Sequence, residues 1–205
     1  MEKELTFTHH FEKGTASEAP LLLLHGTGGN EMDLLGLGRA ISSSRSLLSP
    51  RGQVLENGMP RFFRRLAEGV FDEADVIKRA HELADFVTDA CKRHDLKKPI
   101  AVGFSNGANI AVAMLFLRPE VLAGAVLLRA MVPLKNPAAV DLQKKPVLLL
   151  SGAADPMILE SNARQLATML TSANAALQHE TLPTGHNLTQ NDVTRAKTWL
   201  QKQGI

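Results

Sequence analysis

The sequence predicts a single α/β domain in which a mostly parallel central sheet carries helices on both faces. Short apolar runs alternate along the chain with stretches of helical periodicity, and this repeated β-then-α order requires right-handed crossovers between parallel strands. Several runs are apolar on both faces, as is typical of buried parallel strands. The chain has 205 residues, 44% of them hydrophobic, which is enough for one substantial core. We therefore expect residues 1–205 to form one domain.

The elements can be placed in order along the chain. The apolar runs that predict strands are Pro20–His25, Leu47–Pro50, Ile100–Phe104, Ala123–Leu128 and Pro146–Ser151, and a last strand is expected over Ala176–Leu182, between the final two helices. Apolar residues at spacings of three and four predict a long helix over Glu73–His94. Further helices are expected at Asn109–Leu117, Leu159–Leu170 and Asp192–Lys202, the last with Trp199 packed against the sheet. The stretch Gly52–Asp72 shows no clear pattern, and an irregular segment of that length suggests a functional loop.

Composition and charge exclude several classes of function. A net charge of +2 is too small to predict binding to nucleic acid or to a membrane surface. The single cysteine, Cys91, excludes internal disulfides and falls on the apolar face of the long helix. The segment Met1–Thr6 has no signal-like apolar core, and no apolar run approaches the roughly 20 residues that cross a bilayer. We expect a cytoplasmic protein that needs no metal and no cofactor.

The most informative motif is Gly103-Phe104-Ser105-Asn106-Gly107. It follows an expected strand and precedes an expected helix, which is the context of a nucleophile elbow. The turn is so tight that only small residues fit on either side of the serine. The start of the helix directs N–H groups toward developing negative charge. Ser105 is therefore the candidate nucleophile, and the alternative is an ordinary strand-to-helix loop.

A serine hydroxyl needs a base, and histidine has a pKa suited to that role. His186 lies on the loop after the last expected strand, from which it can reach over the strand ends. Asp155 directly follows another strand and is the candidate acid that orients the histidine. The chain order Ser105, Asp155, His186 favours this assignment over a turn histidine and a helix-capping aspartate. Asp141 and Asp192 are weaker candidates because neither follows an expected strand.

An oxyanion hole completes the set of parts that acyl transfer needs. The backbone N–H of Asn106, the residue after the nucleophile, is one expected donor. The second is expected from the loop His25–Gly29, with Thr27 as the candidate, because glycines there let the backbone approach a substrate oxygen. The loop lacks the sequence of a P-loop and the glycine spacing of a dinucleotide site, so we exclude phosphate binding.

With these parts in place, the chain resembles the small serine hydrolases of the phospholipase/carboxylesterase group, which includes acyl-protein thioesterases and proteins similar to dienelactone hydrolase. The likeness covers nearly the whole chain and is carried by His25–Asn30, Gly103–Gly107, Gly152–Pro156 and Gly185–His186. The stretches Ser49–Gly52 and Glu56–Phe63 look like a bacterial branch of this group. The resemblance implies an α/β-hydrolase fold without a large cap domain, the triad Ser105, Asp155 and His186, and hydrolysis of carboxylic esters. Dienelactone hydrolase itself has a cysteine nucleophile, which argues against a ring-cleavage lactone as substrate.

Several apolar residues are candidates for a substrate pocket. These are Met59, Phe62, Phe63 and Phe71 of the Gly52–Asp72 stretch, together with Met157, Ile158 and Leu188. Arginines of the same stretch are candidates for binding a carboxylate. The alternative is that the phenylalanines belong to the core and the arginines are solvated. Because only a modest segment separates Arg129 from Pro146, we expect an open, shallow site for short or soluble acyl groups.

Three functions fit these features. A serine carboxylesterase that acts on a small-molecule ester is favoured. A thioesterase for acyl-protein or acyl-coenzyme A conjugates would use the same residues. A non-catalytic protein that binds a small molecule on a hydrolase fold would not need all three triad residues. The sequence leaves the oligomeric state open, with a homodimer as the candidate assembly.

Overall fold

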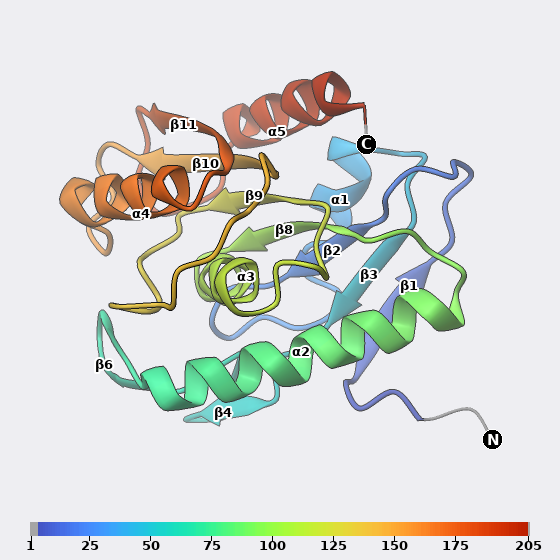
Figure 1. Cartoon of the computed structure of the whole chain (residues 1–205), viewed down its shortest axis with the longest axis horizontal. Coiled ribbons are helices and arrows are strands. Elements are labelled where there is room, and N and C mark those ends of the chain that lie inside the picture. Colours follow the sequence, from blue (N-terminus) through green and yellow to red (C-terminus); the bar gives the residue numbers. More distant parts are fainter. Residues whose placement is uncertain (1–3, 205) are drawn as a thin grey trace.

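The computed structural model describes residues 4–204, which form a seven-stranded sheet with helices on both faces (Figure 1). In spatial order the strands are β1 (His9–Glu12), β3 (Leu47–Pro50), β2 (Leu21–Leu24), β8 (Ile100–Phe104), β9 (Gly124–Leu128), β10 (Pro146–Gly152) and β11 (Ala176–Leu182). The edge strand β1 runs antiparallel to β3, and every other pair in this sheet is parallel. The predicted α/β class with a mostly parallel sheet is confirmed.

Two layers of helices cover the sheet (Figure 1). The helices are α1 (Leu35–Ile41), α2 (Glu73–Arg93), α3 (Asn106–Leu117), α4 (Glu160–Ser172) and α5 (Gln190–Gln203). Apolar residues of α2, α3 and α4 share one core cluster with the sheet, and those of α1 and α5 share another. Strand β2 joins the two, because Leu22 and Leu24 pack into the first cluster while Leu21 and Leu23 pack into the second. Both faces of β2 are buried, which explains why every residue from Leu21 to Leu24 is apolar.

The expected strands and helices are present, with shifts of a few residues at their ends. Trp199 packs in the core on the α5 side, as predicted. Cys91, on α2, is half-buried and packs against the core. Burial raises the pKa of its thiol to about 11. None of the helices that the structure describes is long and apolar enough to span a bilayer.

The stretch Gly52–Asp72 is the main correction, because it folds into two β-hairpins instead of an irregular loop. The hairpins pair β4 (Val54–Glu56) with β5 (Met59–Arg61), and β6 (Arg65–Ala67) with β7 (Val70–Phe71). In the first turn, Asn57 and Gly58 both have positive φ, 51° and 80°. An Asn-Gly pair in that conformation is the signature of a two-residue hairpin turn, so the sequence did hold the signal. Strand β1 and helix α1 were also not predicted.

Candidate active site

Three loops at the carboxyl edge of the parallel sheet meet at one point. Ser105 follows β8, Asp155 follows β10, and His186 follows β11. Parallel strands bring their carboxyl ends to the same edge, which is where ligands bind in open α/β sheets. Residues separated by up to 81 positions in the chain are thereby brought within hydrogen-bond distance.

Ser105 occupies a strained turn between β8 and α3. Its φ of 52° and ψ of −115° lie outside the regions that a residue with a side chain normally adopts. A Cβ at Gly103 would lie 2.6 Å from Ala108 Cα, and a Cβ at Gly107 would lie 1.9 Å from the carbonyl oxygen of Leu24. Glycines are therefore required on both sides of the serine, because the backbone passes too closely for any larger residue.

The three side chains form a continuous chain of hydrogen bonds. His186 Nε2 lies 3.0 Å from Ser105 Oγ, and His186 Nδ1 lies 2.8 Å from Asp155 Oδ2. The other oxygen of Asp155 accepts the backbone N–H groups of Met157 at 2.9 Å and Ile158 at 3.1 Å. The Asp155 side chain is only 1% exposed. A buried, hydrogen-bonded carboxylate at Nδ1 leaves Nε2 free to accept the serine proton.

Thr27 and Asn106, the expected oxyanion donors, line the same cavity as Ser105 and His186. Asn106 is the first residue of α3, so its N–H belongs to the unpaired amides at the helix start. Its side-chain oxygen accepts the backbone N–H of Phe62 at 2.8 Å. Thr27 Oγ1 accepts a hydrogen bond from Arg61 Nη1 at 2.7 Å. Both residues are thus held from the side of the first hairpin.

The strand β2 end is tied to the same hairpin. The backbone N–H of Gly28 donates to the carbonyl of Pro60 at 2.9 Å, and that of Gly52 donates to His25 Nε2 at 2.9 Å. His25 Nδ1 lies 2.7 Å from the carbonyl oxygen of Gly26, which can only accept. These partners require the neutral tautomer with the proton on Nδ1, and burial lowers the pKa of His25. No local pattern in the sequence predicts these contacts of His25, because its partners come from the first hairpin and from the loop after β2.

The cavity in front of Ser105 is small, about 40 Å³. Its walls combine polar and apolar residues, namely Thr27, Arg61, Arg65, Glu68, Gly69, Phe71, Asn109, Arg129, Met131, Met157 and Ile158. Of the apolar pocket candidates from the sequence, Phe71, Met157 and Ile158 line it. No local pattern predicts Met131 as a lining residue, because its position depends on how the segment after β9 folds.

The other apolar candidates lie elsewhere. Phe62 and Phe63 are 3% and 0% exposed and belong to the core. Leu188 packs against the core on the α5 side. Met59 is 40% exposed and lies beside Gly28, outside the cavity lining. The fold of the Gly52–Asp72 stretch explains the difference. Both phenylalanines pack into the core cluster that α2, α3 and α4 share with the sheet, and not into the cavity at Ser105.

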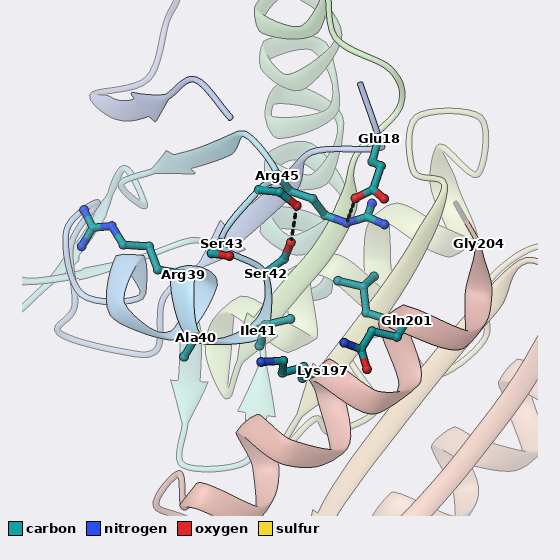
Figure 2. A pocket seen from close by; sticks show the side chains of 12 residues that line it. Glu18, Arg39, Ala40, Ile41, Ser42, Ser43, Arg45, Lys197, Gln201 and Gly204 are labelled. Carbon is teal, nitrogen blue, oxygen red and sulfur yellow. Dashed lines mark hydrogen bonds and ion pairs between the residues drawn. The ribbon is translucent and has the colours of Figure 1, made fainter. Parts of the chain in front are cut away.

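A larger cavity, of about 660 Å³, lies away from these residues between the end of α1 and α5 (Figure 2). Arg45 lies in its wall, where its Nε pairs with Glu18 at 3.1 Å and its Nη1 donates to the carbonyl of Ala19 at 2.7 Å. The charge of Arg45 is therefore matched within the protein. Serines 42–44 line this cavity without any histidine beside them, so no activated nucleophile is present there.

Asp192 and Asp141, the weaker candidates for the acid, have other roles. Asp192 and Arg129 form a bidentate ion pair, with oxygen–nitrogen distances of 2.8 and 2.9 Å and no exposed side-chain surface. Arg129 also donates to the carbonyls of Gly185 at 3.0 Å and Asn187 at 3.2 Å. The pair thus fixes the loop that carries His186. Asp141 accepts the Gln143 and Asn174 amides, both at 2.8 Å, in an exposed turn.

No group of three or more His, Cys, Asp or Glu side chains within residues 4–204 is arranged to hold a metal ion.

The parallel sheet and the strained serine turn at its carboxyl edge define an α/β-hydrolase. Residues 11–203 match the family described as Phospholipase/Carboxylesterase. The chain is 46% identical over 196 residues to the Bacillus subtilis (strain 168) protein MhqD, a hydrolase by name, with 95% of this chain and 98% of that protein covered. The chain belongs to the phospholipase/carboxylesterase family.

Solved structures give the same result. The carboxylesterase of Bacillus cereus superposes with a TM-score of 0.93 at 46% identity, over 96% of this chain and 94% of that one. A carboxylesterase from Mesorhizobium loti superposes with a TM-score of 0.91 at 30% identity, over 97% and 96% of the two chains. These likenesses cover nearly the whole chain.

We predict that Arg129→Met lowers the free energy of unfolding by about 3–5 kcal/mol, because it leaves the buried Asp192 carboxylate without its partner. The double variant Arg129→Met/Asp192→Leu should be less destabilised, since no charge then stays buried. Urea unfolding measures both. Arg118→Met removes the surface ion pairs with Asp85 and Glu120 and serves as the control, with an expected loss of about 1 kcal/mol or less. Equal losses for Arg129→Met and Arg118→Met would contradict the structural role of the pair.

We also predict that His25 makes stability pH-dependent. The pKa of His25 is lowered in the folded protein, so the unfolded chain binds the proton more readily and stability falls as the pH drops below about 6.5. One such histidine contributes up to about 1.4 kcal/mol per pH unit, and the lowered pKa values of His94 and His179 act in the same direction.

The test compares urea unfolding of the wild type and His25→Gln between pH 7.5 and 5.0. Glutamine keeps one donor for the Gly26 carbonyl and one acceptor for the Gly52 amide but does not titrate. The variant should lose less stability on acidification than the wild type. His81→Gln, on the surface of α2, is the matched control. An unchanged pH dependence in His25→Gln would exclude His25 as a source of the effect.

Proposed function

We propose that this protein is a serine carboxylesterase that hydrolyses small carboxylic esters through an acyl-enzyme. The observation that carries the proposal is the hydrogen-bond chain from Ser105 through His186 to the buried Asp155, built on a strained turn. Local strain of this kind persists only where the surrounding structure imposes it, and it is typical of functional sites. The family and the carboxylesterases among the related structures support the same chemistry.

The mechanism follows from the positions of the atoms. Ser105 Oγ attacks the ester carbonyl while His186 Nε2 accepts its proton, and Asp155 stabilises the imidazolium that forms. The backbone amides of Thr27 and Asn106, which line the same cavity, are the proposed donors to the oxyanion. His186 then donates its proton to the leaving alcohol, and the acyl group stays on Ser105. A water molecule, deprotonated by His186, releases the acid and restores the serine.

The substrate is expected to carry a short acyl group. The cavity beside Ser105 is about 40 Å³, and the domain has no large cap that could enclose a long chain. A matched pair of an oxygen ester and a thioester with the same short acyl group tests the leaving group. A higher kcat/KM for the oxygen ester supports a carboxylesterase, whereas a clear preference for the thioester would assign the protein as a thioesterase.

We predict that a fluorophosphonate adds once to the wild type, on Ser105, and not to Ser105→Ala. The same variant should lose about a millionfold in kcat on a short-chain nitrophenyl ester. Intact-mass analysis and peptide mapping locate the adduct. Ser151→Ala is the matched control, because Ser151 also contacts a histidine, His179, yet lies outside the cavity lining. No adduct on folded wild-type protein would reject the esterase in favour of a non-catalytic binding protein.

We predict that Asp155→Asn lowers kcat by about ten-thousandfold, because an amide no longer fixes the histidine tautomer. Thermal unfolding of the variant shows whether the fold persists. An activity within tenfold of the wild type would contradict the assignment of Asp155 as the orienting acid.

A further inference from the structure

Arg65, on the second hairpin, lines the same cavity as Ser105 and His186. Its Nε donates to Glu56 Oε1 at 2.8 Å, which links the two hairpins and holds the guanidinium in place. Among residues 4–204, Glu56 is its only hydrogen-bonding partner, so the Nη1 and Nη2 groups have donors left for a ligand. The side chain is 27% exposed, which leaves it accessible from the cavity. Arg65 is thus a fixed cation with free donors beside the nucleophile.

The charges around the cavity are unequal. Arg61 and Arg65 share one carboxylate, since Glu56 Oε2 lies 3.1 Å from Arg61 Nε and Oε1 pairs with Arg65. Arg61 is buried and already donates to the carbonyl of Phe63 and to Thr27. Arg129 is neutralised by its own partner. At this wall of the cavity two guanidinium groups therefore share one carboxylate, while the Asp155 carboxylate lies behind His186, hydrogen-bonded to its Nδ1.

Glu68 is the acidic residue among those that line the cavity, and it lies in an exposed turn. Solvent screens an exposed carboxylate more strongly than it screens the half-buried guanidinium of Arg65. The wall also contains Phe71, Met131 and Ile158, which are suited to a short carbon skeleton. A cation next to a small apolar wall fits an organic acid better than it fits a neutral lipid.

We infer that Arg65 is a specificity-determining residue that binds a carboxylate on the substrate, so that the preferred substrates are small esters bearing a second, free carboxylate. The inference rests on the proposed esterase function and deepens it. A guanidinium presents two parallel N–H donors to a carboxylate, and here Glu56 has already fixed its orientation. The ester group would then lie over Ser105 while the free carboxylate contacts Arg65.

The test uses two pairs of esters that differ only in charge. 4-Nitrophenyl hydrogen fumarate and its methyl ester carry the difference on the acyl side, and 3-acetoxybenzoate and its methyl ester carry it on the alcohol side. In neither anion can the carboxylate reach its own ester carbonyl, so spontaneous hydrolysis stays comparable. The readout is the ratio of kcat/KM for the charged ester to that for the neutral ester, compared between wild type and variants.

We predict that Arg65→Gln lowers this ratio by about tenfold or more for at least one pair, as expected for loss of a charge-assisted hydrogen bond. Arg65→Lys should give an intermediate ratio, because a lysine keeps the charge and loses the paired donors. Arg64→Gln is the matched control. Arg64 is the neighbouring arginine, is 64% exposed, and pairs with Asp72 outside the cavity lining, so its ratio should stay at the wild-type value.

Two outcomes separate the inference from the esterase function. If the wild type reacts with a fluorophosphonate and hydrolyses neutral esters, but Arg65→Gln leaves both ratios unchanged, the esterase stands and the carboxylate site is rejected. If no ester is hydrolysed and Ser105 is not labelled, both proposals fall.

A measurement on the wild type covers the case in which the Arg65 variants do not fold. Fumarate should compete with a neutral nitrophenyl ester at least about tenfold more strongly than dimethyl fumarate does, and raising the salt concentration should weaken this competition. Equal inhibition by the two compounds would overturn the inference.

Discussion

The buried ion pair between Arg129 and Asp192 is the interaction on which the placement of His186 depends. Arg129 directly follows β9, and its backbone N–H donates to the carbonyl of Leu150 in β10. Its guanidinium holds the carbonyls of Gly185 and Asn187, on either side of His186. Asp192 closes the capping box of α5 with Thr189. One pair of charges therefore joins two strands, the histidine loop and the last helix, although neither residue takes part in the proposed chemistry.

The opposite side of the cavity is fixed by hydrogen bonds from the first hairpin. Arg61 bonds to Thr27, and the amide of Phe62 bonds to Asn106, so one short strand reaches both expected oxyanion donors. Preorganised donors of this kind stabilise a transition state because they need not reorient as charge develops. The sheet carries Ser105, His186 and Asp155 in the loops at its strand ends. The hairpins supply the walls that hold the oxyanion loop and line the cavity.

The sequence predicts the parts of this site that depend on local pattern. The sequence predicts that Ser105, Asp155 and His186 lie together because each follows an expected strand. The carboxyl ends of parallel strands must meet at one edge of the sheet. The Asn57-Gly58 turn carried an equally local signal for the first hairpin. Helix α1 was not predicted because it is short and has no side-chain cap, and β1 because its half-buried residues lie at the sheet edge. Whether Phe62 and Phe63 face core or cavity depends on how the hairpin docks.

The distribution of polar groups shows where this domain accepts unfavourable local structure. Ser105 has positive φ and Arg61 is a guanidinium with 3% of its side chain exposed, each of which costs free energy in isolation. Both conditions are offset by contacts that converge on one cavity: the close glycine packing below Ser105, and the shared carboxylate of Glu56. Arg65 is different, because Glu56 bonds only to its Nε and the side chain also lines the cavity. A ligand carboxylate would bond to the remaining donors of Arg65. The buried Arg61 already has protein partners, so the proposed specificity residue is Arg65 and not Arg61.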